Sequence, residues 1–287
     1  MGKFLIVLLA LAFLAALNGS GSRPGQHPEK PQRIVSLAPA ITETLQALDL
    51  GENLAGVTRF CRIAPGAAPV PEVGGFREVS LEAIARTNAD LLLLPHDMAH
   101  FRSMIEALGI PVLLFSYASL PDYLASVRTL GRICGREEQA ERLVSEFNAA
   151  FAAQASQAAP TVLFVLLNPD EFDSQPAEMT IVGSDEFYNG VIAAAGGRNA
   201  YAGPVPFPRI SLEALLGLKP DVIVLAAPRH TDENRLLASW RNAPGLKQAK
   251  ASQFLLLCDP ADTIPGPSAL ATIQKLAQAI RSVRESG

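Results

Sequence analysis

The sequence has few of the features that mark a disulfide-rich domain or a common class of enzyme. Its 287 residues include three cysteines, Cys61, Cys134 and Cys258, with no Cys-x-x-Cys pair. An odd count leaves at least one thiol unpaired, so we interpret these residues as buried structural thiols. The chain has no Gly-x-Ser-x-Gly elbow, no Gly-x4-Gly-Lys-Ser/Thr phosphate loop and no Gly-x-Gly-x-x-Gly turn after the first predicted strand. These absences argue against the enzyme classes that depend on those motifs.

Positive charge is also scarce. Lys and Arg number 24 against 28 for Asp and Glu, which gives a formal net charge of −4. Proteins that bind nucleic acid usually carry a basic patch or stripe, so we expect no nucleic-acid partner. Hydrophobic residues make up 49% of the chain, which is enough for real cores in one large or two ordinary domains.

The N-terminus carries one apolar run, from Phe4 to Leu17, after the charge of Lys3. The run is shorter than the ~20 residues of a membrane span and fits the apolar region of a secretory signal. We therefore predict a signal peptide over residues 1–22 and a flexible, proline-rich lead over residues 23–32. No cysteine follows the run to accept a lipid. An uncleaved anchor and a buried N-terminal helix are the alternatives.

One segment occurs twice in the chain. Residues 76–84 and 207–215 share Phe, Ser, Leu, Glu and Ala at matching positions, and at the same offset Asp90 matches Asp221. Each copy predicts a loop and a short helix, followed by a continuous apolar strand of the kind that is buried on both faces. Two distant copies of one unit predict two similar lobes.

Strand and helix patterns alternate on both sides of a helical middle, which indicates parallel βαβ units. A helix from Glu137 to about Ser156 has one apolar stripe and predicts a helical boundary between the lobes. The fold class is α/β, with two Rossmann-like lobes joined by a single long helix. The predicted parts are an N-terminal lobe over 33–120, a helical linker over 121–158 and a C-terminal lobe over 159–287.

Several ordered motifs together carry a resemblance to a known family. They are Arg33-Ile-Val-Ser-Leu-Ala-Pro-Ala-Ile-Thr-Glu43, Gly56-Val-Thr-Arg-Phe60, Val73-Gly-Gly75, the two Ser-Leu-Glu-Ala segments and Ala195-Gly-Gly-Arg-Asn199. With these, the chain resembles the solute-binding proteins of ABC importers for cobalamin, ferric siderophores and haem. The resemblance runs from about Arg33 to the C-terminus and implies a ligand cleft between the two lobes.

The resemblance also implies a function. We expect a monomeric periplasmic protein, with no intrinsic cofactor and no enzymatic activity, that delivers a metal chelate to an ABC permease and its ATPase. A corrinoid is the favoured ligand and a ferric siderophore the next. The alternatives are a direct metal or haem binder of the same fold, or a chelatase-like enzyme.

Glu82 and Glu213 occupy the same place in the two copies of the repeat. Each lies two residues after a serine that could cap a helix, so it misses the three-residue spacing of a capping box and its carboxylate can face solvent. An acid near the positive end of a helix would explain one copy. In proteins that look like this one, the paired glutamates bind arginines of the permease, and we predict that role here.

Aromatic rings provide the predicted ligand contacts. Phe76 and Phe207 lie just before the repeated helices, and by resemblance Phe60 and Phe207 match positions where cobalamin binders place ligand-contacting rings. Flat, apolar ligands suit such rings. The chain departs from the best-known cobalamin binder, whose cleft is rich in tryptophan, because its single Trp is at position 240 in a predicted helix. Further predicted ligand contacts are Pro39, Arg229 and Asp259.

Histidines offer a weaker hypothesis of metal ligation. His96 and His230 follow matching strands of the two lobes, and neutral imidazoles could hold a metal from both sides. Hydrogen-bonded surface histidines are the plainer interpretation. Haem receptors of the family commonly carry a tyrosine ligand just after a Val-Gly, and that place is Gly75 here, which argues against haem.

Overall fold

The computed structural model describes residues 30–75, 78–152, 159–167, 178–227, 231–243, 245–246 and 253–286. The predicted signal peptide lies outside this part, as do residues 23–29 of the predicted lead. Residues 30–32 of that lead are held in place, because the Lys30 N–H donates to Ile133 O over 3.0 Å and the Gln32 N–H donates to Asp90 Oδ2 over 2.8 Å. Within the described ranges no helix is long and apolar enough to cross a membrane.

The first lobe is built on a parallel sheet in the order β2-β1-β3-β4. Its strands are short and almost wholly buried, because helices cover both faces. Ile34, Leu91 and Leu93 face α2, α5 and α6, while Val35 and Leu92 face α3 and α4. The strands are β1 (Ile34–Ser36), β2 (Leu54–Val57), β3 (Leu91–Pro95) and β4 (Val112–Phe115). The helices are α2 (Pro39–Ala47), η1 (Gly51–Asn53), α3 (Leu81–Arg86), η2 (His96–Phe101), α4 (Arg102–Glu106), α5 (Leu120–Cys134) and α6 (Glu137–Phe151).

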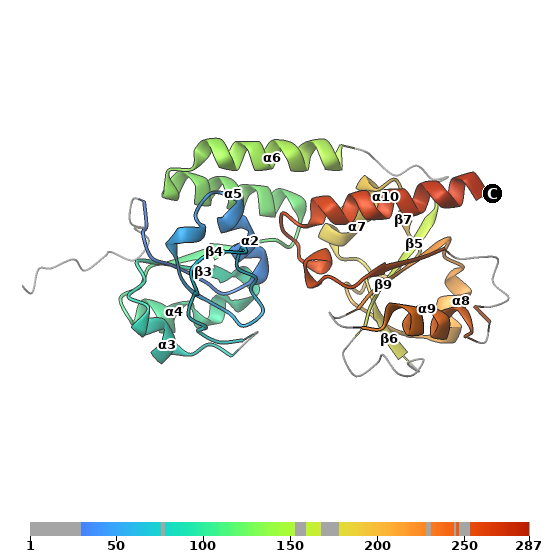
Figure 1. Cartoon of the computed structure of the whole chain (residues 1–287), viewed down its shortest axis with the longest axis horizontal. Helices are drawn as coiled ribbons and strands as arrows, with labels where there is room; N and C mark the ends of the chain where they lie inside the picture. The colour runs from blue at the N-terminus through green and yellow to red at the C-terminus, as the bar shows by residue number, and fades with distance from the viewer. Residues whose placement is uncertain are drawn as a thin grey trace, which may run out of the picture.

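The second lobe has a mixed sheet in the order β10-β9-β5-β6-β8, with β7 also paired to β5. Helices α7 and α10 cover one face, and α8 and α9 cover the other (Figure 1). The strands are β5 (Thr161–Leu166), β6 (Glu178–Ile181), β7 (Arg198–Asn199), β8 (Arg209–Ser211), β9 (Val222–Ala226) and β10 (Gln253–Leu257). The helices are α7 (Glu186–Ala194), α8 (Leu212–Leu218), α9 (Glu233–Arg241), η4 (Pro260–Thr263) and α10 (Ala269–Ser286).

The two lobes share their central plan and differ at one edge. The predicted repeat is structural, because α3 and α8 begin at matching residues and β3 and β9 span matching residues. However, β6 runs antiparallel to β5, and β8 runs antiparallel to β6. The sequence pattern predicts a loop over residues 168–180, so the start of β6 corrects that prediction. Strands this short leave little periodicity to detect.

The predicted linker contains two helices. α5 packs on the first-lobe sheet, and α6 packs on α5 so closely that a Cβ at Gly131 would lie 2.5 Å from the Ala140 Cβ. α6 ends at Phe151, whereas the sequence predicts an end near Ser156. It lies above the first lobe and points toward the second (Figure 1).

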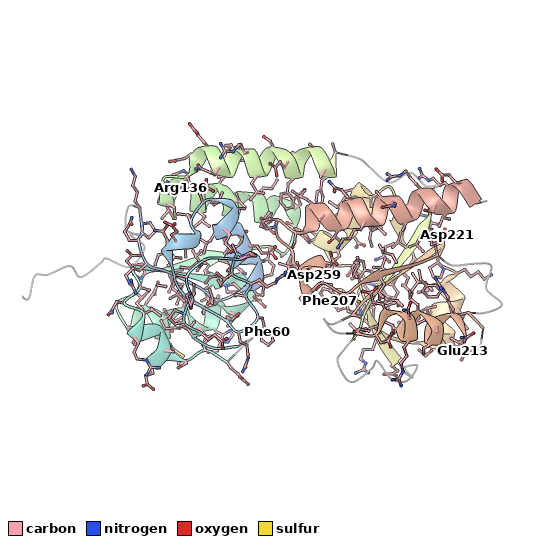
Figure 2. All side chains as sticks on the ribbon, in the orientation of Figure 1. Phe60, Arg136, Phe207, Glu213, Asp221 and Asp259 are labelled. Atoms are coloured by element: carbon pink, nitrogen blue, oxygen red, sulfur yellow. The ribbon has the colours of Figure 1, made fainter. Side chains whose placement is uncertain are left out.

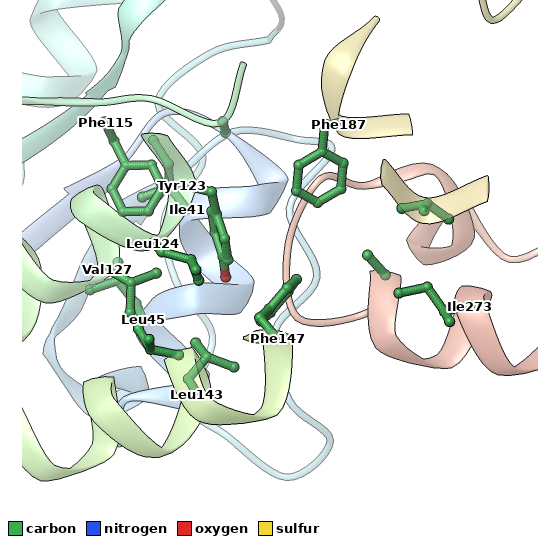
Figure 3. Packing of buried hydrophobic residues seen from close by; sticks show 14 of the residues in the cluster. Ile41, Leu45, Phe115, Tyr123, Leu124, Val127, Leu143, Phe147, Phe187 and Ile273 are labelled. Atoms are coloured by element: carbon green, nitrogen blue, oxygen red, sulfur yellow. The ribbon is translucent and has the colours of Figure 1, made fainter. Parts of the chain in front are cut away.

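One hydrophobic cluster continues from the first lobe into the second. It joins Leu45 of α2, Tyr123 of α5, Phe147 of α6, Phe187 of α7 and Ile273 of α10 (Figure 3). The Tyr123 ring centroid lies 5.0 Å from that of Phe147 and 6.2 Å from that of Phe187. The lobes are therefore joined by packed side chains as well as by the chain itself.

Candidate ligand-binding site

A cavity of about 740 Å³ lies between the two lobes and takes most of its lining from apolar side chains. Ligand sites of proteins commonly measure about 300–1,000 Å³ and are lined in this way, with a few polar groups that set orientation. Residues of both lobes line it. In the first lobe they lie at or just beyond the ends of the parallel strands, and in the second lobe they lie at the start of α7, just before β8 and around the end of η4. The carboxyl edge of an open parallel sheet, as in the first lobe, is where ligands generally bind.

The first-lobe wall contains two of the predicted contacts. Pro39 is the first residue of α2, where a missing N–H costs nothing, and it lines the cavity just after β1. Phe60 follows β2 in a turn, and 54% of its surface is exposed. His96 and Asp97 at the start of η2 complete this side, together with residues 115–118. The structure therefore brings Pro39, Phe60 and His96 to one cavity.

The second-lobe wall contains Phe207, the second described residue among the predicted ring contacts, which is 43% exposed. Its ring packs edge-on against Tyr188, with the centroids 6.2 Å apart. Asp185 caps the start of α7 by accepting the Tyr188 N–H at 2.9 Å, and it also lines the cavity. Figure 2 shows Phe60 and Phe207 on opposite sides of the space between the lobes. Each lobe thus presents one exposed phenylalanine ring to the cavity, beside the more buried rings of Phe115 and Tyr117 on one wall and Phe187 and Tyr188 on the other.

Arg59 supports the Phe60 ring. Its guanidinium lies 5.6 Å from the ring centroid, a distance typical of a cation–π contact, and forms an ion pair of 2.5 Å with Glu78. A Cβ at Gly75 would lie 2.2 Å from Arg59 Nη2, so only glycine leaves room for this arrangement. Arg59 thereby packs against the Phe60 ring at the cavity rim.

Burial shapes the titration of the cavity groups. It raises the pKa of Asp185, and the N–H groups of Tyr188 and Phe187 oppose this rise. Burial, with a smaller contribution from the Asp97 charge, raises the pKa of Tyr117 to about 12. Burial also raises the pKa of Tyr188, whose hydroxyl donates to Thr263 O. Both tyrosines therefore present neutral hydroxyls at neutral pH.

Asp259, a predicted ligand contact, lies outside the cavity lining. Its carboxylate forms an ion pair with Arg62 of the first lobe and accepts the Ala261 N–H at 3.0 Å at the start of η4. Figure 2 places it where the lobes meet. The position of Asp259 at the end of a strand predicts a contact with the ligand, but its side chain pairs with Arg62 across the two lobes.

Glu82 and Glu213 occupy equivalent positions on the two lobes. Ser80 and Ser211 cap α3 and α8, each by accepting an N–H at 3.2 Å, and each glutamate lies in the first turn of its helix. Both glutamates are exposed, and Glu82 forms an ion pair of 2.8 Å with Arg86. Figure 1 shows α3 and α8 on different lobes, both on the side away from α6.

The remaining predicted residues are not described by the structure. Phe76, Arg229 and His230 lie outside the described ranges. Within those ranges no group of three or more His, Cys, Asp and Glu side chains could hold a metal ion. Sequence reasoning also missed Tyr117, Asp185 and Tyr188. A usable signal existed for Tyr117, which lies just beyond β4 at the ligand-binding edge, and for Asp185, which has the capping position of a predicted helix.

A model of the family described as "Periplasmic binding protein" matches residues 34–255. The chain belongs to this family. Its members are solute-binding proteins of transport systems and not enzymes, so the prediction that the chain is no enzyme is confirmed at the level of the family. The predicted α/β fold of two lobes is confirmed as well.

Relatives of this periplasmic binding protein include vitamin B12-binding and haem-binding proteins. The vitamin B12-binding protein of Pectobacterium carotovorum subsp. carotovorum (strain PC1) is 27% identical over 203 residues, which cover 68% of this chain and 71% of the relative. The apo form of the periplasmic haem-binding protein RhuT of Roseiflexus sp. RS-1 is 26% identical, with a TM-score of 0.70 over 88% of this chain and 98% of that one. The vitamin B12 binding protein BtuF of Vibrio cholerae shares the fold at 19% identity, with a TM-score of 0.70 over 90% of this chain and 100% of that one.

Proposed function

We propose that this protein is the solute-binding component of an ABC importer and that it captures a corrinoid. The observation that carries the proposal is the cavity of about 740 Å³ between the lobes, with the exposed rings of Phe60 and Phe207 on opposite walls. Exposed rings on opposite walls of an apolar space suit a large, flat ligand, because each ring can pack against the ligand from one side.

Curated relatives support a corrinoid as the first candidate. Those with 24–27% identity include vitamin B12-binding proteins of several bacteria. A ferric siderophore is the next candidate. Haem is the alternative within the same fold, because the haem-binding protein RhuT is 26% identical and His96 lines the cavity, where an imidazole could reach a metal.

Delivery to a permease is the second part of the proposal. Glu82 and Glu213 each lie in the first turn of a short helix, one on each lobe, and both are exposed. Carboxylates in equivalent places on two lobes can dock on two basic sites of a membrane partner. Exposed ion pairs contribute only about 0–1 kcal/mol each, so the pairs set orientation more than affinity. Export through residues 1–22 would bring the protein to this partner.

Ligand recovery and titration test the capture step. Protein purified from its own host should carry the visible absorption bands of a corrinoid, and the stripped protein should bind cyanocobalamin in a calorimetric titration. Haemin and ferric siderophores serve as the competing ligands. Release of the recovered ligand unchanged in mass separates a binder from a chelatase-like enzyme. Binding of haemin alone would replace the corrinoid with haem, and binding of none of these ligands would refute the proposal.

A further inference from the structure

The charged side chains of the cavity lining are acidic on both lobes. Asp97 at the start of η2 lines the first-lobe wall, and Asp185 at the start of α7 lines the second-lobe wall. The described lining residues include no lysine and no arginine. Among them, His96 is the one side chain that could carry a positive charge. At neutral pH the described lining therefore presents negative charge from two sides.

The arginines nearest to the cavity rim in sequence are already engaged. Arg59 pairs with Glu78 and supports the Phe60 ring, while Arg62 pairs with Asp259. Arg209, two residues beyond Phe207, pairs with Glu178 over 3.6 Å. Recruiting any of these guanidinium groups for a ligand carboxylate would break an ion pair that the folded protein makes. Each of these guanidinium groups lies beside a carboxylate, so the pairs bring no net positive charge to the cavity rim.

The hydrogen-bonding capacity of the lining points in the same direction. Ionised carboxylates only accept hydrogen bonds, whereas Lys, Arg, Asn and Gln are the strong side-chain donors, and none of these four types lines the described cavity. The Tyr188 hydroxyl is already used as a donor to Thr263 O. Beside hydroxyl groups such as that of Tyr117, the described lining thus has carboxylate acceptors on both walls and no lysine, arginine or side-chain amide donor.

We propose that this cavity selects its ligand by charge, and that it admits a neutral or cationic chelate with amide or ammonium N–H donors and disfavours a chelate that carries carboxylates. The inference rests on the proposed function as a chelate-binding protein and names the chemical class of its ligand. A carboxylate brought between Asp97 and Asp185 loses hydration and meets like charge, with no described cation to compensate. A peripheral amide instead donates its N–H groups to the same oxygens.

A matched series of ligands tests the selection. The probes are cyanocobalamin, cationic cobinamide, and cyanocobalamin derivatives in which one or three peripheral amides are hydrolysed to carboxylates. We expect cyanocobalamin and cobinamide to bind best. The derivative with one carboxylate should have a dissociation constant about tenfold higher at low salt. Because exposed charges are screened, this penalty should shrink as the salt rises from about 0.01 M to about 1 M. A steric penalty would not change with salt.

Matched variants assign the penalty to the two aspartates. Asp97→Asn with Asp185→Asn removes both charges, and asparagine still caps α7. This variant should bind the carboxylate derivatives nearly as well as cyanocobalamin. The control is Asp49→Asn, which removes a charge away from the cavity lining at a residue with φ of 57°, a conformation that asparagine tolerates. The control should keep the full penalty.

The outcomes separate this inference from the proposed function. Equal binding of amide and carboxylate corrinoids, or a penalty that survives in the double variant, overturns the charge selection and leaves corrinoid capture standing. If no corrinoid binds, a cationic ferric trihydroxamate and an anionic ferric tricatecholate repeat the comparison, and preference for the anion overturns the inference. Tight binding of haemin, which carries two carboxylates, also overturns it. Failure of every chelate to bind refutes both the proposed function and the selection.

Discussion

Glu43 of α2 in the first lobe accepts two hydrogen bonds from Ser268, which immediately precedes α10 in the second lobe, at 2.7 Å from Oγ and 3.3 Å from N. Arg62 and Asp259 form a second polar bridge between the lobes. Pro39 and Ala40 of α2 line the ligand cavity, as do Thr263, Ile264 and Pro265 just before Ser268. The lobes are therefore tied together by the same segments that contact the ligand space.

The ionisation of Glu43 lowers the stability of the folded protein in a pH-dependent way. Burial raises the pKa of Glu43, and this exceeds the opposing effects of the Ser268 hydrogen bonds and the Arg62 charge. The folded protein therefore binds more protons than the unfolded chain just above the usual pKa range of glutamate, and stability falls as the pH rises through that interval. Glu43→Gln keeps an oxygen acceptor without the charge, so it should raise the free energy of unfolding at neutral pH.

Urea unfolding at neutral and at acid pH checks this sign. The gain of Glu43→Gln should disappear at a pH where glutamate is protonated in both states. Ser268→Ala is the contrasting variant, because it removes a donor to Glu43 and should destabilise the protein at neutral pH. A gain of the same size at both pH values would contradict the assigned cause.

Phe60 and Phe207 should each contribute to ligand affinity. Replacing either residue with alanine removes one of the two exposed rings that line the cavity. We expect each change to weaken ligand binding about tenfold, mainly through faster dissociation. Stopped-flow or calorimetric titration measures the effect. Met104→Ala is the control, since this side chain on α4 is 48% exposed and lies outside the cavity lining. Unchanged affinity in the Phe60→Ala and Phe207→Ala double variant would remove the rings from the site.

Glu82 and Glu213 should matter for transport and not for capture. Glu82→Ala combined with Glu213→Ala should abolish uptake by cells while ligand affinity and thermal stability stay within error of the parent, because both carboxylates are exposed and neither lines the cavity. Uptake of radiolabelled ligand measures the first property and calorimetry the second. Glu146→Ala, at an exposed residue of α6, controls for loss of a surface charge. Normal uptake by the double variant would exclude the docking role.

Asp90 and Asp221 are structural counterparts in the two lobes. Asp90 accepts the Gln32 and Arg33 N–H groups at 2.8 and 3.0 Å, just before β1, and Asp221 accepts the N–H and hydroxyl of Thr161 at 2.7 and 2.8 Å, at the start of β5. Alanine at either site should lower the free energy of unfolding by about 1–3 kcal/mol. Urea titration provides the measurement, and a loss no larger than that of Glu146→Ala would contradict it.

Cys134 should resist alkylation in the folded protein. Burial raises the pKa of its thiol to about 12, so only about one molecule in ten thousand carries the thiolate at about pH 8. Iodoacetamide labelling followed by peptide mass spectrometry should leave Cys134 unmodified until urea unfolds the chain. Rapid native labelling at this residue would show that the segment opens.

The sequence predicts the fold well where apolar runs are continuous. The buried strands β3 and β9 and the helices α3 and α8 follow from the repeated segment, because fully buried strands and capped helices have distinctive composition. The antiparallel strands at the edge of the second-lobe sheet could not be predicted from the sequence. β8 has three residues and β6 has four, and their pairing depends on contacts between distant segments.

The site was predictable only in part, for a related physical reason. Phe60 and Phe207 could be identified because motifs place them, and both line the cavity. Asp259 has an equally favourable position at the end of a strand, but the nearby Arg62 draws its carboxylate into an ion pair between the lobes. Asp97 and Asp185 face the cavity only because two lobes are packed in one relative orientation. Such an orientation is a property of the whole chain.

The aromatic side chains that cross from α5 and α6 to α7 have a consequence for how the protein denatures. Tyr123 contacts both Phe147 and Phe187, and all three rings are fully enclosed within a single cluster (Figure 3). Either lobe expressed by itself would expose its share of this aromatic contact to solvent and would tend to aggregate. On heating, the intact chain should melt in one cooperative step despite its twofold architecture.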